Sequence, residues 1–137
     1  MKLEQSRKTD TGLLILRVSL GVMMLLHGIA KLMKGTGGIE GLMSQSGLPG
    51  FLAYGVYVGE VLAPILLIIG YRVRLAALLF MATMAVAVLL AHAHDIFSLT
   101  NSGGWGIELQ AQYFFGALAL YFTGGGKLAV STGNKWD

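Results

Sequence analysis

Four long apolar stretches constrain the fold of this chain more than any other feature of its sequence. They cover residues 13–33, 51–70, 75–92 and 107–122 of a 137-residue chain. Charged residues make up only 12% of the sequence, against about 25% in soluble domains, which is too few to cover a soluble surface. Stretches of about 20 apolar residues are long enough to cross a bilayer as helices. The sequence therefore predicts an all-α, polytopic membrane protein, a single domain over residues 1–137 built as a bundle of four transmembrane helices.

Composition also excludes several classes of protein and of site. The chain has no cysteine, so it cannot be a disulfide scaffold and has no thiolate for a zinc or iron–sulfur site. It also has no haem-attachment motif. The net charge of +3 does not come from one basic patch, because the basic residues are spread along the chain. We therefore expect the lipid bilayer, and no nucleic acid, as a partner.

The distribution of basic residues predicts how the chain crosses the membrane. Lys and Arg are frequent before the first stretch, between the second and third, and after the fourth. None occurs between Leu75 and Gly126. By the positive-inside rule, both termini are expected to be cytoplasmic. The first apolar stretch exceeds the 7–15 residues usual in a signal peptide, so we expect an uncleaved anchor.

Glu60 is the most unusual residue in these stretches. It lies near the middle of the second one, about 15 Å along a helix from its start. A charge at this depth costs at least about 2.5–3.5 kcal/mol, so such residues usually face the bundle and mark a site. Pro64 has no amide to bond with the carbonyl four residues earlier, which is that of Glu60. One helical turn thus offers both a carboxyl group and a free backbone acceptor.

Other polar residues fall at similar depth on the first and fourth stretches. His27 and Lys31 are four residues apart and share a helix face, as do Glu108 and Gln112. At 1.5 Å per residue, His27 and Glu108 lie about 21 Å from the cytoplasmic side and Gln112 about 15 Å. We interpret these residues and Glu60 as one polar cluster between the helices, in the outer half of the membrane.

Polar groups near the ends of the stretches allow two interpretations each. Arg17 lies about 6 Å from the cytoplasmic side, so its side chain either reaches Glu60 or extends to the inner surface. His92, His94 and Asp95 follow the third stretch. In an extended segment they could chelate a metal, but a polar cap at the interface is the commoner role, and we predict no metal site.

The order of these residues resembles the DoxX family of small four-helix membrane proteins. The resemblance extends over about residues 12–127, although the Gly-Pro-Gly element that usually closes the family pattern is replaced by Gly124-Gly-Gly126. Glu108 also follows its glycine pair later than in many members. The matching elements are Leu16-Arg17 with Gly21, His27-Gly28-x-x-Lys31-Leu32, Gly47-Leu48-Pro49, Glu60, Gly70-x-x-x-Arg74-Leu-Ala-Ala77, and Gly103-Gly104 before Glu108.

The resemblance implies a bacterial inner-membrane protein associated with membrane oxidoreductase assemblies, such as thiosulfate:quinone oxidoreductase. Our leading hypothesis is a subunit that binds a quinone or similar small redox molecule and receives electrons from a partner protein. Glu60 and His27 are the predicted catalytic residues, because quinone reduction takes up protons as well as electrons. The predicted ligand-binding residues are Arg17, Lys31, Glu108 and Gln112.

Two alternatives belong to other functional classes. In the first, the polar cluster is a structural ion-pair network, and the chain is a non-catalytic scaffold or anchor for a partner protein. In the second, His27 and Glu60 form a proton relay in a small solute carrier. Four helices are few for a carrier, so that hypothesis expects a homo-oligomer formed through Gly55 and Gly59. The sequence does not identify the ligand or the partner.

Overall fold

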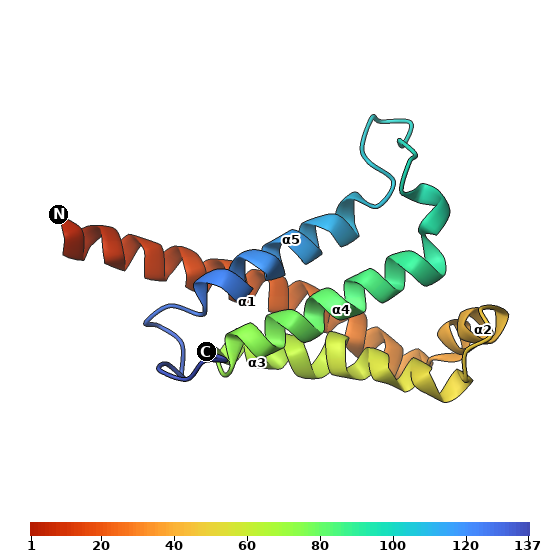
Figure 1. Cartoon of the computed structure of the whole chain (residues 1–137), viewed down its shortest axis with the longest axis horizontal. Coiled ribbons are helices and arrows are strands. Elements are labelled where there is room, and N and C mark those ends of the chain that lie inside the picture. The colour runs from red at the N-terminus through yellow and green to blue at the C-terminus, as the bar shows by residue number, and fades with distance from the viewer.

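The structure, a computed structural model, describes all 137 residues and is 73% helical with no β-strand (Figure 1). This confirms the predicted all-α class. Two long helices, α1 and α4, are joined with shorter elements into an elongated bundle. In chain order the elements are α1 (Lys2–Lys34), α2 (Gly37–Gln45), the 3-10 helix η1 (Gly50–Gly55), the π-helix η2 (Val58–Leu62), α3 (Ala63–Ile69), α4 (Val73–Ala91), the 3-10 turn η3 (Ala93–Asp95) and α5 (Glu108–Thr123).

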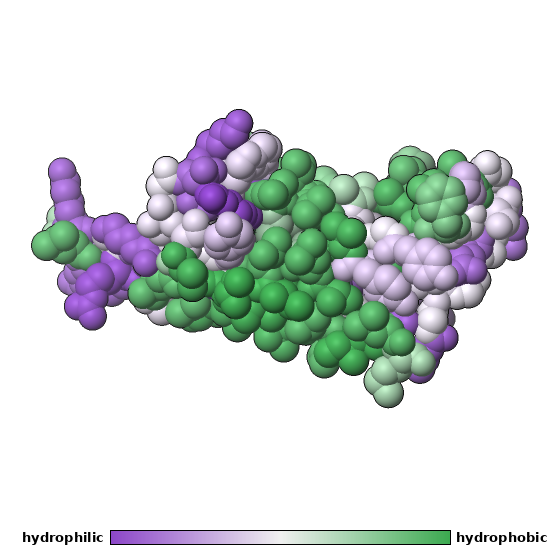
Figure 2. Space-filling view, turned by 90° about the horizontal axis from the view of Figure 1, so that it is seen from below, coloured by the Kyte–Doolittle hydropathy of each residue, from purple (hydrophilic) through white to green (hydrophobic).

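Three segments are long and apolar enough to cross a membrane: α1, the continuous segment Gly50–Ile69, and α4. The fourth predicted helix is present as α5, but its 16 residues extend only about 24 Å. Figure 2 shows hydrophobic residues in a continuous band across the middle of one face, with hydrophilic residues gathered towards the ends. Such a band is typical of a surface in contact with lipid.

Helix α1 begins at Lys2, eleven residues before the start predicted from hydropathy at residue 13. Hydropathy detects only the part of a helix that is apolar, whereas the polar first turns contain good helix formers and no proline. An ion pair between Glu4 and Lys8, 2.8 Å apart at i and i+4, further supports this extension.

The second span is not a uniform α-helix. Pro64 has no amide to donate to the carbonyl of Glu60. Just before Pro64, the helical hydrogen-bond pattern shifts by one residue, and the amide of Ala63 donates to the carbonyl of Val58, five residues earlier. This wider turn forms η2 between η1 and α3. π-helical turns of this kind occur frequently at functional sites.

Glycines allow the close helix contacts of the bundle. A Cβ at Gly21 would clash with Ile68 and with the carbonyl of Pro64 on α3, so only glycine permits this approach of α1. Gly59 has the same role against Thr83 of α4. Gly55, by contrast, has open space around it. Of the two glycines expected to form an oligomer contact, Gly59 therefore packs within the bundle, and only Gly55 is left free.

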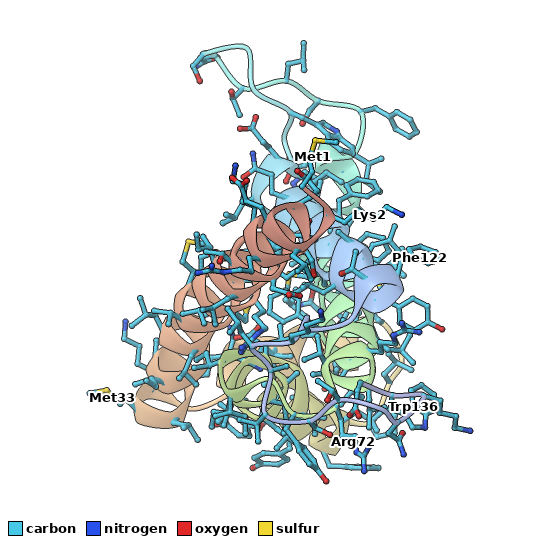
Figure 3. All side chains as sticks on the ribbon, turned by 90° about the vertical axis from the view of Figure 1, so that its left-hand side faces the viewer. Met1, Lys2, Met33, Arg72, Phe122 and Trp136 are labelled. Carbon is cyan, nitrogen blue, oxygen red and sulfur yellow. The ribbon has the colours of Figure 1, made fainter.

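The segment after α5 folds back over the end of the bundle that carries the N-terminus (Figure 1). Its backbone supplies partners to both helices of the α3–α4 turn: the amide of Ser131 donates to the carbonyl of Gly70, and the amide of Arg74 donates to that of Trp136. Arg72 and Trp136, labelled in Figure 3, lie at this end. The tail thus satisfies helix-terminal groups that would otherwise lack partners.

Asp137 holds the tail to this turn. Its carboxylate, only 6% exposed, accepts hydrogen bonds from the Ser131 hydroxyl at 2.7 Å and the Asn134 amide at 2.7 Å. It also pairs with Arg72 at 3.2 Å. Desolvation acts to raise the pKa of Asp137, but these hydrogen bonds and the Arg72 charge outweigh it, so the pKa is lowered.

Candidate functional site

An ion pair joins the first two spans at the position where the sequence predicts a site. Lys31, in the last turn of α1, places its Nζ 2.5 Å from Oε2 of Glu60 in η2. The Glu60 side chain is 7% exposed and that of Lys31 is 28% exposed. The Tyr57 hydroxyl donates to the backbone carbonyl of Lys31 at 3.2 Å, which further ties the end of α1 to the second span. The charge of Glu60 is therefore compensated by one neighbouring cation.

The backbone of Glu60 takes part in the same helix contact. Gly28, one turn before Lys31 on α1, lies against the carbonyl of Glu60, so a Cβ at this position would clash with its oxygen. That carbonyl is the acceptor that Pro64 leaves without its usual amide. Close approach at Gly28 and the register change in η2 together place the carboxylate within reach of Lys31.

A cavity of about 580 Å³ opens beside this ion pair. Its size falls within the range of about 300–1,000 Å³ typical of small-molecule sites. The cavity lies between the second span and α4, and residues of α2 line part of it. Apolar side chains dominate its lining, and Lys31 and Glu60 carry its only charges. The lining residues are Lys31, Ile39, Leu42, Met43, Leu48, Leu52, Ala53, Gly55, Val56, Val58, Glu60, Leu79, Ala82, Thr83, Val86, Ala87, Leu90 and Ala91.

His27 does not join this cavity. Its imidazole is exposed and packs edge-on against Tyr113 of α5, with the ring centroids 6.4 Å apart. Tyr113 is buried and packs against Phe80, with the two ring centroids 5.7 Å apart. Sequence analysis did not identify Tyr113 as a site residue, because an aromatic residue in an apolar span carries no distinguishing signal.

Arg17 adopts neither of the two predicted arrangements. It is 1% exposed, and its guanidinium donates to the carbonyls of Leu67 at 3.0 Å and Ile68 at 2.5 Å, at the end of α3. A third hydrogen bond, 2.7 Å long, reaches the carbonyl of Leu128 in the tail. Arg17 therefore neither reaches Glu60 nor extends to the surface, but caps α3 and holds the tail.

Glu108 and Gln112 also lie apart from the ion pair. Oε2 of Glu108 accepts a hydrogen bond from the amide of Trp105 at 3.2 Å, at the start of α5. The Gln112 side chain is exposed and lines no part of the cavity beside Lys31. The predicted polar cluster is thus divided among three places: the Lys31–Glu60 pair, the His27–Tyr113 contact, and the beginning of α5.

His92, His94 and Asp95 gather after α4. Oδ2 of Asp95 lies 3.2 Å from Nδ1 of His92 and 3.4 Å from Nε2 of His94. No group of three or more His, Asp or Glu side chains has an arrangement that could hold a metal ion. These residues form a polar cap where the chain leaves the helix.

The chain is similar to a known protein family and to two relatives. The DoxX family model matches residues 12–93. The chain is similar to the Bacillus subtilis protein named "Putative oxidoreductase CatD", with 30% identity over 84 residues, which are 61% of this chain and 62% of CatD. The match thus spans less than two thirds of CatD.

A second relative covers more of the chain. This relative is an uncharacterized protein of Haemophilus influenzae, which is 33% identical to the chain over 128 residues, with 90% of each chain covered. No solved structure matches the chain. The family match covers more than half of the sequence and includes Glu60, Lys31 and the glycines that pack against them. The chain therefore belongs to the DoxX family.

Proposed function

We propose that this protein crosses the bacterial inner membrane four times, with α5 as the fourth span and both termini in the cytoplasm. The bundle end that carries the N-terminus and the tail also carries Arg72 and Arg74, and this basic end suits the cytoplasmic side. Helix α5 is short for a span, but local bilayer thinning accommodates such a mismatch at modest cost.

We further propose that the chain is the membrane subunit of an oxidoreductase and binds a quinone or a similar small redox molecule. The observation that carries this proposal is the apolar 580 Å³ cavity whose only charges are the Lys31–Glu60 pair. Apolar walls suit the ring and tail of such a ligand, and a few polar groups orient it. The Lys31 ammonium donates a hydrogen bond to a ring oxygen, and the Glu60 carboxyl exchanges the proton that accompanies reduction. His27 lines no part of the cavity, so these two residues make the direct contacts.

The electrons in this proposal come from a partner protein. The sequence has no cysteine to hold an iron–sulfur cluster, and a quinone alone does not supply the electrons for its own reduction. The relative named "Putative oxidoreductase CatD" supports redox chemistry as the reaction class of this proposal.

Mass spectrometry of the organic extract tests this function. The wild-type protein is purified in native-lipid nanodiscs, beside Glu60→Gln, Lys31→Met and His27→Ala variants. Glu4→Gln is the matched control, because Glu4 is an exposed carboxylate far along α1 from the cavity. We expect a near-stoichiometric quinone in the wild type and in Glu4→Gln, and its loss in Glu60→Gln while the protein stays folded.

Two results would overturn the proposal: wild-type protein with no quinone above the level of the surrounding lipid, or full quinone retention in Glu60→Gln. The first result would favour a non-catalytic scaffold. The structure offers one observation for that alternative, since the buried ion pair also joins α1 to the second span. A scaffold predicts that Glu60→Gln loses folding and partner recovery together.

A further inference from the structure

A second amphipathic site lies where α4 ends and α5 begins, away from the Lys31–Glu60 cavity. In the topology proposed above, this end of the bundle faces outward. An apolar groove of about 310 Å³ runs between these two helices and includes Ala85, Ala111 and Phe114. A polar cup of about 570 Å³ is formed by the loop before α5 and by the first turn of α5. Trp105 and Gln110 line both, so the cup and the groove are adjacent. Neither shares a lining residue with the cavity beside Glu60.

The polar cup and the apolar groove match the two parts of a lipid, its polar headgroup and its hydrocarbon chain. Trp105 is 40% exposed, and its indole Nε1 donates to the carbonyl of Ile96 at 2.7 Å. A tryptophan held in this way at the end of a span is typical of the membrane–water interface. The groove continues from Trp105 along the apolar faces of α4 and α5, and the cup opens on the loop side. A molecule that fills both needs a polar head and a hydrocarbon chain.

The charge of the cup selects the kind of head. Glu108 carries the only formal charge in its lining, and the other polar groups there include the hydroxyls of Thr100 and Ser102. Oε2 of Glu108 accepts a hydrogen bond from the backbone amide of Trp105, so Oε1 is left without a protein partner. No Lys or Arg occurs between Leu75 and Gly126 to attract a purely anionic head. A head that carries an ammonium beside its phosphate complements this set of groups.

We propose that the cup and groove bind a phospholipid with a primary ammonium headgroup, phosphatidylethanolamine, in the outer leaflet. The ammonium donates to the Glu108 carboxylate, and the phosphate accepts from the Ser102 hydroxyl and the Gln110 amide. One acyl chain lies in the groove between α4 and α5. This assigns Glu108 to lipid recognition and separates it from the Lys31–Glu60 pair.

Native mass spectrometry of the delipidated protein tests the site. Phosphatidylethanolamine, phosphatidylcholine and phosphatidylglycerol with identical acyl chains are titrated separately. We expect the wild type to bind the ethanolamine lipid about three- to fivefold more tightly than the other two. Against phosphatidylglycerol this gain comes from an exposed ion pair with Glu108, and against phosphatidylcholine it comes from the N–H donors that the quaternary nitrogen lacks. Equal binding of all three lipids would overturn the proposal and indicate an unselective lipid belt.

Variants locate this preference within the molecule. Glu108→Gln keeps an acceptor for the amide of Trp105 but removes the charge, so it should abolish the preference without unfolding the loop. Glu40→Gln, at an acid of α2 outside the cup and groove, is the matched control and should keep it. Ala111→Leu narrows the groove and should weaken the binding of all three lipids to the same extent. A preference that persists in Glu108→Gln would refute the assignment.

A series of lipids tests the headgroup contact without any variant. Stepwise methylation of the ethanolamine nitrogen removes its N–H donors but keeps the positive charge. We expect affinity for the wild type to fall with each methyl group, because a hydrogen-bonded ammonium binds a carboxylate better than a methylated one. Affinity that does not change along this series would contradict a contact between the ammonium and Glu108.

Discussion

The Lys31–Glu60 ion pair makes an asymmetric prediction for single and double substitutions. In Lys31→Met, the Glu60 side chain, only 7% exposed, loses its cationic partner. In Glu60→Gln, the Lys31 ammonium is left, but its side chain is 28% exposed and lies in the last turn of α1, from which it can reach water. We therefore expect Lys31→Met to destabilise the protein more than Glu60→Gln.

The burial of each partner sets the size of these effects. Leaving a buried charge without its partner costs about 3–5 kcal/mol, which we assign to Lys31→Met. Losing a charge-assisted hydrogen bond from a partly exposed lysine costs about 1.5–3 kcal/mol, which we assign to Glu60→Gln. The double variant Lys31→Met/Glu60→Gln carries no unpaired charge, so its cost should not exceed that of Glu60→Gln alone. The double variant would then fall short of the sum of the two single variants by at least the cost of Lys31→Met, so the coupling energy has a magnitude of about 3–5 kcal/mol.

Steric trapping in detergent micelles measures the free energy of unfolding for all four proteins of this cycle. A matched cycle on Glu4 and Lys8, an exposed pair at i and i+4, should give a coupling near the 0.3–0.5 kcal/mol usual for such pairs. If the double variant of the Lys31–Glu60 cycle costs the sum of its singles to within about 0.5 kcal/mol, the two residues do not interact as the structure shows. The reasoning about the site would then fail.

Three further predictions concern the packing and the tail. Gly28→Ala should destabilise the protein by about 1–3 kcal/mol, because the added methyl group would clash with the backbone carbonyl of Glu60. Gly12→Ala meets open space and should leave the stability unchanged, so thermal unfolding of the two variants tests this prediction. Arg17→Met should cost about 3 kcal/mol or more, since three carbonyls lose a charged donor, and accelerated proteolysis of the tail would report it. The lowered pKa of Asp137 means that its carboxylate stabilises the tail above the ordinary pKa of about 3.9, and that this contribution is lost as pH falls through the lowered value. The fluorescence of Trp136 should therefore change in that acidic range, and Asp137→Asn should abolish the change.

The four long helical segments of this fold were predictable from the sequence because one physical quantity, the length of apolar stretches, indicates them. Their ends were less predictable where that quantity carries no information, as in the polar first turns of α1. The register change of the second span was visible in Pro64, but its shape was not, because a missing hydrogen bond permits a kink as well as a π-helix.

The site was predictable only residue by residue. Glu60 stood out by its depth, and the structure places Lys31 beside it. His27 shares a helix face with Lys31, yet residues four apart differ by about 40° around a helix, which is enough to turn His27 towards Tyr113 instead. The cavity could not be foreseen, because it depends on how α2 and α4 meet across the second span.

The hydrogen bonds of Arg17 have a consequence for the order in which the chain assembles during synthesis. Its acceptors lie 50, 51 and 111 residues further along the sequence. When α1 first enters the lipid, this cation has none of them and carries an insertion cost of up to about 2.5–3.5 kcal/mol. The first hydrogen bonds become available once α3 has been made, and the last only after Leu128 has left the ribosome. The hydrogen bonds that hold Arg17 can therefore be completed only when nearly the whole chain has been translated.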